Sequence, residues 1–180
     1  MQNAHNTLEL LHEIRTDTFR NAAPMPLRRT AKAEWQGLAF QIGGMRLVSP
    51  LGEVVEILDM PRVAQLPGVQ SWVLGIANVR GSLLPIIDVH GFLGLTPTLP
   101  SSMWRVLLVD DGEVSAGLLV EQSLGLQHFA ADNFESTQPD GFPQLQQFLR
   151  GAYRHGGRVY YQVELASLLR DERFLAVADR

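Results

Sequence analysis

Several polar side chains in this sequence have the type and spacing that could support catalysis. Asp88 and His90 are separated by one residue, so the carboxylate could orient the histidine as a general base. Asp110 and Asp111 are adjacent and form a possible acid pair. Asp88 ends an apolar run, however, so helix capping explains it, and solvation at the start of a helical turn explains His90. Asp110-Asp111-Gly112 has the composition of a turn, because aspartate side chains accept hydrogen bonds from their own backbone. We favour capping and turn formation, and a small β-barrel enzyme that uses Asp88 and His90 stands as the alternative.

The sequence lacks the motifs that other catalytic or metal-binding sites require. The remaining histidines show no H-x-x-x-H or H-E-x-x-H spacing, and the chain contains no cysteine, which excludes thiol catalysis and cysteine-bound zinc. It contains no G-x-S-x-G, Walker or G-x-G-x-x-G segment either. We therefore expect no catalytic residue, no metal and no cofactor.

Composition narrows the class of partner. The 180 residues carry a formal net charge of -4 without a cluster of Lys or Arg, which argues against nucleic acid or an anionic membrane as the partner. The apolar runs are too short to span a bilayer, and the first residues lack the layout of a signal peptide. The absence of cysteine suits a reducing cytosol. These features indicate a cytoplasmic globular protein without direct membrane insertion.

The chain divides into an N-terminal tail, residues 1–34, and a body, residues 35–180. In the tail, Asn6 and Glu9 resemble a capping box, and apolar residues at helical spacing predict a helix that ends near Arg20. Two prolines further on break any helix, which leaves a linker before the body. The tail is either a loosely docked, frayed segment or a helix that binds a partner.

In the body the hydrophobic period changes from near four to two, which is typical of strands. Alternating apolar residues flank the turn Gly43-Gly44, and the segment RVLLVDDGEVSAGLLVE, residues 105–121, repeats this pattern around its own turn. Short strands with close turns indicate an all-β barrel or sandwich rather than alternating α/β units.

The body also repeats itself at an offset of 76 residues. Without a gap, LLPIIDVHGFL (83–93) aligns with VYYQVELASLL (159–169), and in both an apolar strand ends in a carboxylate and runs into a short helical segment. The elements occur twice in the same order: hairpin, strand, strand, strand-to-helix. We therefore predict two small β units of about 65–75 residues, one for each repeat, that pack together and leave a groove between them.

The run SWVLGIANVRGSLLPIIDVHGFLGL, residues 71–95, resembles the signature of CheW-like domains. These are the coupling proteins of bacterial chemosensory arrays and the matching regulatory domain of CheA kinases. The resemblance continues over GEVVEIL (52–58) and over residues 105–126 and 148–169, so it covers nearly all of the body. It implies an all-β fold of two fused, SH3-like, five-stranded barrels with short helices and an N-terminal helical tail, without catalytic activity.

The resemblance also implies two partners in arrays of membrane-bound receptors. One is the regulatory domain of a CheA-type histidine kinase, and the other is the cytoplasmic tip of a methyl-accepting chemoreceptor, which binds in a groove between the barrels. Within the family, the chain is most similar to the adaptors of type IV pilus (twitching) systems. A flagellar chemotaxis coupling protein and a paralogue of the kinase's own domain are the alternatives.

Four residues match family positions that are linked with receptor coupling: Val54, Glu56, Gly75 and Arg80. By resemblance Arg80 lies beside Glu56, and we expect a semi-buried guanidinium to need such a carboxylate. We interpret the pair as a structural clasp near the groove, with a role in architecture alone or in partner docking as well. Gly75 is expected to be small because another segment packs closely against it or because the backbone turns there.

Four further residues are expected to shape the segment NVRGSLLPIIDV, residues 78–89. Gly81 allows a tight turn between two strands. Pro85 cannot donate to a sheet ladder and therefore requires an edge or a bulge. Asn78 and Asp88 belong to the same structural motif, at its two ends. No motif identifies the kinase-facing surface, for which exposed apolar residues of the second unit are the candidates.

Overall fold

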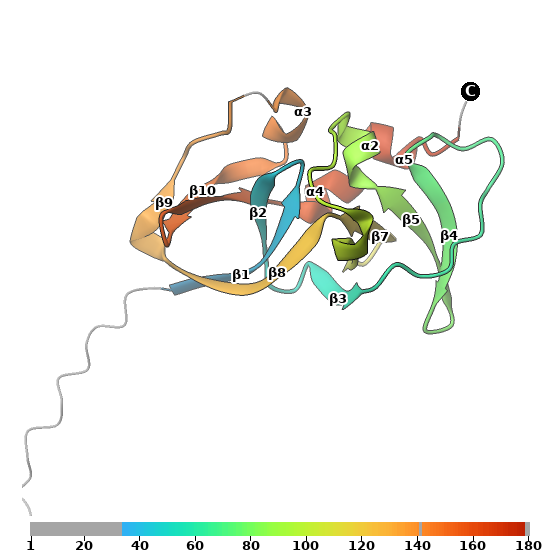
Figure 1. Ribbon diagram of the computed structural model, residues 1–180, viewed down its shortest axis with the longest axis horizontal. Helices are drawn as coiled ribbons and strands as arrows, with labels where there is room; N and C mark the ends of the chain where they lie inside the picture. Colours follow the sequence, from blue (N-terminus) through green and yellow to red (C-terminus); the bar gives the residue numbers. More distant parts are fainter. Residues whose placement is uncertain (1–33, 141, 179–180) are drawn as a thin grey trace, which may run out of the picture. The chain divides into compact units, whose positions relative to one another are not determined.

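The computed structural model describes residues 34–140 and 142–178 (Figure 1). The helix predicted in the N-terminal tail and nearly all of the linker after it lie outside the described residues. The body is all-β, as predicted: its two sheets form two SH3-like barrels, and its helices are short.

The first sheet joins strands from the two ends of the body. The N-terminal hairpin pairs with β8 on one side and, in parallel, with β11 on the other, where Leu47 lies opposite Tyr161. The order is β8-β1-β2-β11-β10-β9, so a two-residue strand makes this sheet one strand larger than predicted. Its strands are β1 (Glu34–Ile42), β2 (Met45–Pro50), β8 (Gln122–Ala130), β9 (Phe134–Glu135), β10 (Leu149–His155) and β11 (Arg158–Val163).

The second sheet is formed by the middle of the chain, in the order β3-β6-β7-β5-β4. Here too a hairpin pairs in parallel with a distant strand, because β7 lies beside β5 with Gly117 opposite Ile86. Edge strands β3 and β4 carry three of the residues predicted for receptor coupling, and the fourth, Arg80, follows directly after β4. The strands are β3 (Val54–Leu58), β4 (Val73–Val79), β5 (Ser82–Asp88), β6 (Arg105–Asp110) and β7 (Ser115–Val120).

Short helices follow the strands that pair in parallel. Helix α2 begins directly after β5, and α4 follows β11 after one residue, as the repeat predicted. The helices are α2 (Val89–Leu93), α3 (Pro143–Gln146), α4 (Leu165–Leu169) and α5 (Glu172–Leu175), with 3-10 turns at Ser101–Met103 and Ala131–Asn133.

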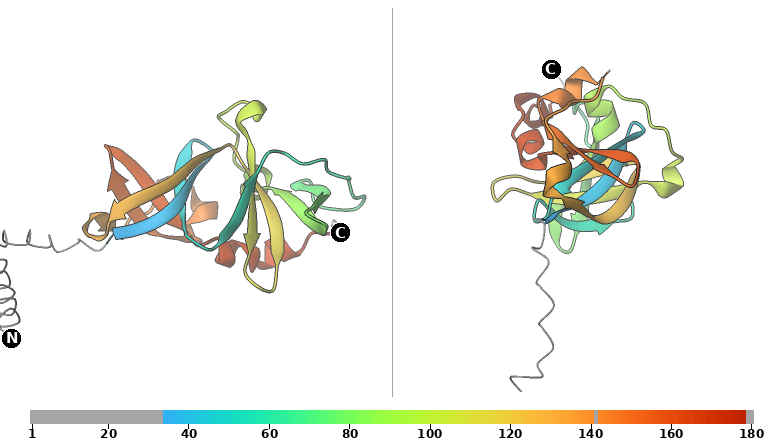
Figure 2. Two further views of the ribbon diagram at one scale, coloured as in Figure 1. Left: turned by 90° about the horizontal axis from the view of Figure 1, so that it is seen from below. Right: turned by 90° about the vertical axis from the view of Figure 1, so that its left-hand side faces the viewer.

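The internal repeat is confirmed, but the prediction that each repeat forms its own unit is wrong. Strand β4, strand β5 and helix α2 recur 76 positions later as β10, β11 and α4. The hairpins, however, have changed places: β1–β2 joins the β10–β11 sheet, and β6–β7 joins the β4–β5 sheet. A period of two reports which faces of a strand are buried and does not report which distant strand lies beside it. Figure 2 shows the two interleaved sheets from two further directions.

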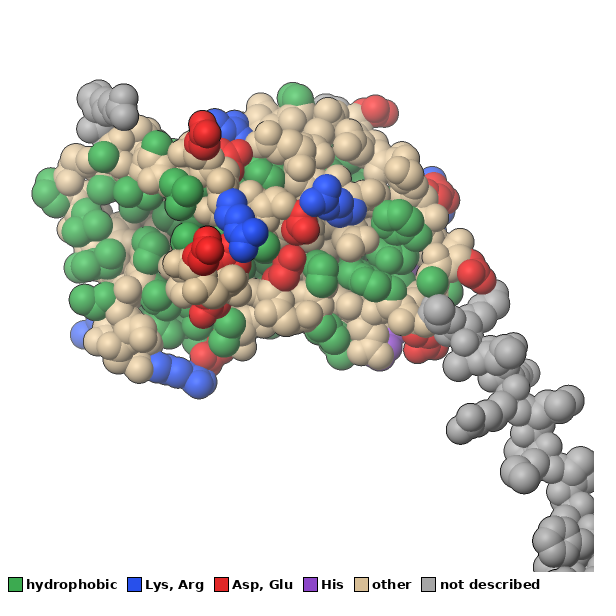
Figure 3. Space-filling view, turned by 180° about the vertical axis from the view of Figure 1, so that it is seen from behind, with side chains coloured by type: hydrophobic (Ala, Val, Ile, Leu, Met, Phe, Trp, Pro, Cys, Tyr) green, Lys and Arg blue, Asp and Glu red, His purple; other side chains and the backbone are tan. Residues whose placement is uncertain are grey.

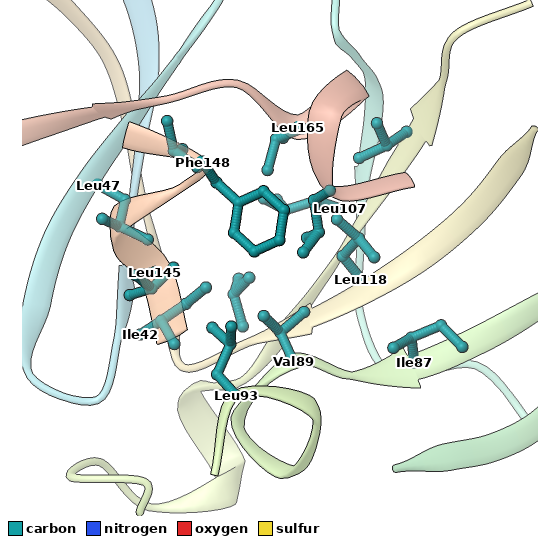
Figure 4. Close-up of a cluster of buried hydrophobic side chains, with 14 of the residues drawn as sticks. Ile42, Leu47, Ile87, Val89, Leu93, Leu107, Leu118, Leu145, Phe148 and Leu165 are labelled. Atoms are coloured by element: carbon teal, nitrogen blue, oxygen red, sulfur yellow. The ribbon is translucent and has the colours of Figure 1, made fainter. Parts of the chain in front are cut away.

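Each barrel has its own core, and the two share a larger one. Strand β6 shows why, because Val106 and Leu108 pack inside the second barrel whereas Leu107 and Val109 face the shared core. Successive side chains of a strand point to opposite faces, so a strand that is apolar throughout serves both. Figure 4 shows the shared core, where side chains of both sheets meet those of the short helices. The aromatic core of the first barrel comprises Phe129, Tyr153 and Tyr160, with Trp35 packed against it.

Candidate functional site

The predicted contact between Arg80 and Glu56 is present. The Nη2 atom of Arg80 donates to Oε1 of Glu56 at 2.7 Å. The arginine side chain is 77% exposed and the glutamate 25%, so the expectation of a semi-buried guanidinium is wrong. The guanidinium is exposed because it stands on the turn between β4 and β5 rather than inside a strand.

This ion pair joins the two edges of the second sheet. Glu56 belongs to edge strand β3, and Arg80 follows edge strand β4. Because no strand pairing connects β3 to β4, the side chains bridge a seam that the backbone leaves open. An exposed pair of this kind stabilises a fold by only about 0–1 kcal/mol. The exposed N–H groups of Arg80 are therefore more important as donors that a partner could contact than as a source of stability.

The β4–β5 turn holds Arg80 in a backbone conformation that an arginine seldom adopts. Arg80 has a φ of 52° and is the one described non-glycine residue with a positive φ, and Gly81 follows at 90°. The side-chain oxygen of Asn78 accepts the Gly81 N–H at 2.8 Å, which fastens the turn. The equivalent turn of the other repeat has Gly156 and Gly157 in these places, at 57° and 72°. A left-handed backbone conformation costs a non-glycine residue roughly 1–2 kcal/mol. The β4–β5 turn therefore carries a conformational cost at Arg80 that the equivalent turn avoids by having glycine in this position.

Gly75 is buried and lies at a bulge where β4 meets β5. A Cβ atom built on Gly75 would lie 2.1 Å from the carbonyl oxygen of Ala64. Ala64 and Ile76 form a backbone bridge with hydrogen bonds of 2.8 and 2.9 Å, which docks the segment before β4 onto that strand. The expected close approach is therefore present, and it comes from backbone. Gly151 occupies the matching bulge of β10, so the arrangement belongs to both repeats.

Val54 and its neighbour point in opposite directions from β3. Val54 is half-buried and packs against the shared core, whereas Val55 is 61% exposed. Six of the ten exposed large hydrophobic side chains among the described residues belong to the first repeat. They lie before β3 (Leu51), on β3 (Val55 and Ile57), between β3 and β4 (Met60 and Leu66) and on β5 (Leu83). Figure 3 shows hydrophobic side chains concentrated toward the end of the body that β4 and β5 form.

A hollow of about 230 Å³ lies beside the clasp at the mouth of the second barrel. All five strands of the sheet contribute to it. Val79, Leu84 and Leu108 supply apolar side chains, and polar residues stand among them. Apolar side chains within a polar rim are typical of surfaces that bind proteins. The complete lining is Val55, Val79, Arg80, Ser82, Leu84, Leu108, Asp110 and Ser115.

Pro85 lies in an interior strand, but its pairing explains why proline is tolerated. The parallel pairing of β5 with β7 begins at Ile86, one residue later, so at Pro85 the strand has a neighbour on one side only. The bulge of β4 at Val73–Gly75 is close by. Both parts of the expectation, an edge or a bulge, therefore hold locally although β5 is not an edge strand.

Asp88 caps helix α2, as predicted, and accepts the His90 N–H at 3.0 Å. Burial alone would raise the pKa of the Asp88 carboxyl, but the hydrogen bonds from His90 and Gly91 outweigh it and hold this pKa below its ordinary value. The solvation expected for His90 is wrong, because its side chain is only 1% exposed and its ring stacks near Trp104.

The acid pair Asp110-Asp111 serves the β6–β7 turn. Asp110 accepts the Gly112 N–H, and Asp111 accepts those of Glu113 and Val114. These backbone bonds hold the pKa of the Asp111 carboxyl below its ordinary value, with help from Arg170. Within residues 34–140 and 142–178, no group of three His, Asp or Glu side chains is placed to hold a metal ion.

One buried carboxylate was missed in the sequence. Glu121 is the single residue between β7 and β8, and its side chain is completely buried. In the sequence, the pattern that could have indicated this burial is a carboxylate directly after the apolar run Ala116–Val120. In the structure, the chain passes from one sheet to the other at this residue.

Comparisons with known proteins agree with this architecture. Residues 36–173 match the CheW-like domain. The chain is 40% identical to the protein PilI of Pseudomonas aeruginosa, over 99% of both chains, and 27% identical to a probable chemotaxis protein CheW of Rhizobium etli, over 73% of this chain and 84% of the relative. The crystal structure of the scaffolding protein TtCheW from Thermoanaerobacter tengcongensis has the same fold, with a TM-score of 0.68 at 18% identity over 78% of this chain and 96% of that one. The chain belongs to the family of CheW-like domain proteins.

Proposed function

We propose that the protein is a non-catalytic adaptor that couples a methyl-accepting chemoreceptor to a CheA-type histidine kinase. The observation that carries the proposal is the likeness to PilI, which extends over 99% of both chains. Relatives named as chemotaxis protein CheW and a relative titled a scaffolding protein support the same class of function. The chemistry of the described side chains agrees, because capping and turn formation account for the acidic groups that had suggested catalysis.

Two surface features support a receptor-binding role for the second barrel. The Glu56–Arg80 clasp leaves most of the guanidinium exposed at the rim of a hollow, and exposed Val55 lines the same hollow. We assign receptor coupling to this face, with Glu56 and Arg80 as direct contacts. Val54 and Gly75 would act indirectly, because Val54 packs on the core and Gly75 is buried. The regulatory domain of the kinase would bind a separate face.

The likeness to PilI favours control of type IV pilus twitching motility, and a flagellar chemotaxis coupling protein is the second candidate. The protein would work in the cytoplasm at arrays of membrane-bound receptors. Among the described residues, no helix is long and apolar enough to cross a membrane. We also propose that the tail predicted over residues 1–34 is separate from the folded body up to residue 33, because Glu34 already pairs with Ala130 as the first residue of β1. Deletion of the gene should abolish pilus-driven surface motility and spare flagellar swimming, whereas the opposite result would select the second candidate.

The experiment that tests the adaptor function measures each partner separately. Val55→Asp places a charge on the apolar face beside the clasp, and it should weaken binding of the full chain to a receptor-tip fragment by roughly 1–3 kcal/mol. Binding to the kinase's regulatory domain should be unchanged. Leu126→Asp is the matched control, because Leu126 is 49% exposed on β8 of the other sheet and should leave receptor binding intact. Equal loss of both partners in a folded Val55→Asp variant would refute separate surfaces, and failure of the unaltered chain to bind either partner would refute the adaptor.

A further inference from the structure

Each half of the body completes its sheet with a hairpin of the other half. We call residues 34–93, from β1 to α2, the first half, and residues 105–178, from β6 onward, the second half. The β1–β2 hairpin of the first half lies between β8 and β11 of the second half. The β6–β7 hairpin of the second half lies between β3 and β5 of the first half. The exchange of hairpins is therefore reciprocal.

Among the described residues, neither half contains a complete sheet. Within the first half the paired strands are β1 with β2 and β4 with β5, and β3 pairs only with β6 of the other half. Within the second half β6 pairs with β7 and β10 pairs with β9 and β11, whereas β8 pairs only with β1. Hairpins of this size are at best marginally stable in water, so each half depends on the other for its fold.

The hydrophobic cores depend on both halves as well. In the first barrel, Val48 of β2 belongs to the same core as Phe129 and Tyr160 of the second half. In the second barrel, Ile86 of β5 belongs to the same core as Val106 of β6. The shared core contains side chains of both hairpins, as Figure 4 shows. The hydrophobic stabilisation of either barrel is therefore available only when the two halves meet.

A single connection, residues 94–104, joins the halves, and we call it the strap. It leads from α2 to β6, and β7 lies between β5 and β6 in the sheet. The strap lies over the β1–β2 turn, because Leu95 and Thr98 side-chain atoms are 3.2 and 3.4 Å from the positions of Cβ atoms built on Gly43 and Gly44. All other contacts between the halves are non-covalent.

The Glu121 carboxylate fastens the strap to the second half. Its Oε1 atom accepts the Thr98 N–H, and its Oε2 atom accepts the Thr98 hydroxyl at 2.9 Å. Oε2 also accepts the Gln41 amide at 3.1 Å and the Gly44 N–H at 3.5 Å. Burial opposes ionisation of this carboxyl, yet the bonds from Thr98, Gly44 and Gln41 outweigh it and hold its pKa below the ordinary value. The strap is thus held by one residue, and the halves are held by whole strands.

We propose that the chain forms a reciprocal dimer with a second copy of itself, in which the first half of each copy assembles with the second half of the other. Every strand pairing and every core contact keeps its residues, and only the strap changes conformation. Exchange of identical elements is a low-cost route to a dimer for this reason. Pro97 and Pro100 favour an extended strap, which is the form that a link between two assembled units needs.

The reciprocal dimer would build each hollow of the second barrel from two chains. Val55, Val79 and Arg80 of its lining belong to the first half, whereas Leu108 and Asp110 belong to the second half. One dimer would therefore present two complete hollows, each with walls from both copies. The inference does not depend on what the hollow binds.

Refolding of the full chain at two concentrations tests for the dimer. In the monomer the strap keeps the two halves at an effective concentration on the order of 1 mM, as short links do. A second copy competes when its own concentration approaches this value. Chain that is unfolded in urea and refolded at about 1 mM should therefore contain a dimer by size-exclusion chromatography, and chain refolded at about 1 µM should contain only a trace of it.

A disulfide between two variants identifies which halves meet, because the chain has no cysteine. Asp59 directly follows β3 and Arg105 begins β6, and their side chains form an ion pair at 3.3 Å between the two halves. Asp59→Cys and Arg105→Cys chains that are refolded together at the higher concentration should form an interchain disulfide on oxidation. Asp59→Cys with Leu126→Cys is the matched control, because Leu126 is also exposed in the second half but lies on β8 of the other sheet.

The length of the strap should shift the balance between monomer and dimer. Deletion of residues 96–99 removes the part that is bonded to Glu121, so it should raise the share of dimer several-fold. Insertion of four Gly or Ser residues after Thr96 should lower that share.

Two results would overturn the proposal. One is a folded protein that stays monomeric after refolding at the higher concentration, with the unaltered strap and with the shortened strap alike. The other is a dimer in which Asp59→Cys and Arg105→Cys give no more interchain disulfide than the control pair, because such a dimer associates through an outer surface. If the shortened strap prevents folding, the disulfide measurement with the unaltered strap gives the answer.

Discussion

Arg80 and Glu56 meet at 2.7 Å across the open seam of the second sheet, one on the β4–β5 turn and the other on edge strand β3. The pair is exposed enough for a partner to reach the guanidinium, and it lies at the rim of the hollow that Val79, Leu84 and Leu108 line with apolar side chains. A weak ion pair in such a place is better suited to recognition than to stability.

A charge exchange tests whether the clasp acts as a pair. Arg80→Glu places two carboxylates together and should lower the free energy of unfolding by up to about 1 kcal/mol. Adding Glu56→Arg should recover part of that loss in urea unfolding, because the opposite charges meet again. A double variant whose stability equals the sum of the two single effects would show that the side chains do not interact.

Replacing Arg80 with glycine separates binding from stability. Arg80→Gly removes the cost of a left-handed arginine, roughly 1–2 kcal/mol, and loses only an exposed ion pair, so the thermal midpoint should be at or above that of the unaltered protein. Receptor-tip binding should nevertheless fall. Gly156→Arg makes the converse change in the equivalent turn, and it should lower stability while leaving receptor binding unchanged. Destabilisation by Arg80→Gly would mean that the arginine is kept for the fold.

Gly75 should be intolerant of any side chain because of the Ala64 carbonyl. Gly75→Ala should cost about 3 kcal/mol or more in unfolding free energy, since it adds a severe overlap to the strain of a positive φ. Gly112→Ala is the matched control, because Gly112 also has a positive φ but has open space around its Cβ position, and it should cost about 1 kcal/mol. Similar costs at the two positions would contradict the close approach.

These positions show what the sequence could predict. The strands, turns and short helices followed from apolar alternation, glycine pairs and the 76-residue repeat, because each depends on neighbouring residues. The hairpin exchange could not be read in this way, since β2·β11 and β5·β7 pair residues that are distant in sequence. The resemblance identified the Arg80–Glu56 contact, but the exposure of Arg80 and the burial of Gly75 and His90 depend on the assembled barrels.

The Glu121 carboxylate should determine how the free energy of unfolding falls at acid pH. Its pKa in the folded protein is below its ordinary value of 4.5, so its contribution is present above that pH and is lost as the pH falls further. Glu121→Gln should lower the free energy of unfolding by about 1–3 kcal/mol at neutral pH, as measured by urea unfolding. The variant should also lose less of its remaining stability than the unaltered chain as the pH is lowered into the acid range. Glu53→Gln should cost less at neutral pH, because burial raises the pKa of Glu53 and already disfavours its ionised form. Parallel acid profiles for Glu121→Gln and the unaltered chain would exclude this role.

An adaptor of this kind must bind receptor and kinase at the same time, and co-sedimentation measures this directly. Membranes that contain the chemoreceptor are mixed with the kinase's regulatory domain and increasing amounts of the full chain, and the sedimented kinase domain is quantified. The kinase domain should sediment only when both the receptor and the adaptor are present, and Arg80→Gly should reduce the amount sedimented although the variant stays folded. Competition between receptor and kinase domain for the adaptor, with no kinase domain carried down at any concentration, would contradict it.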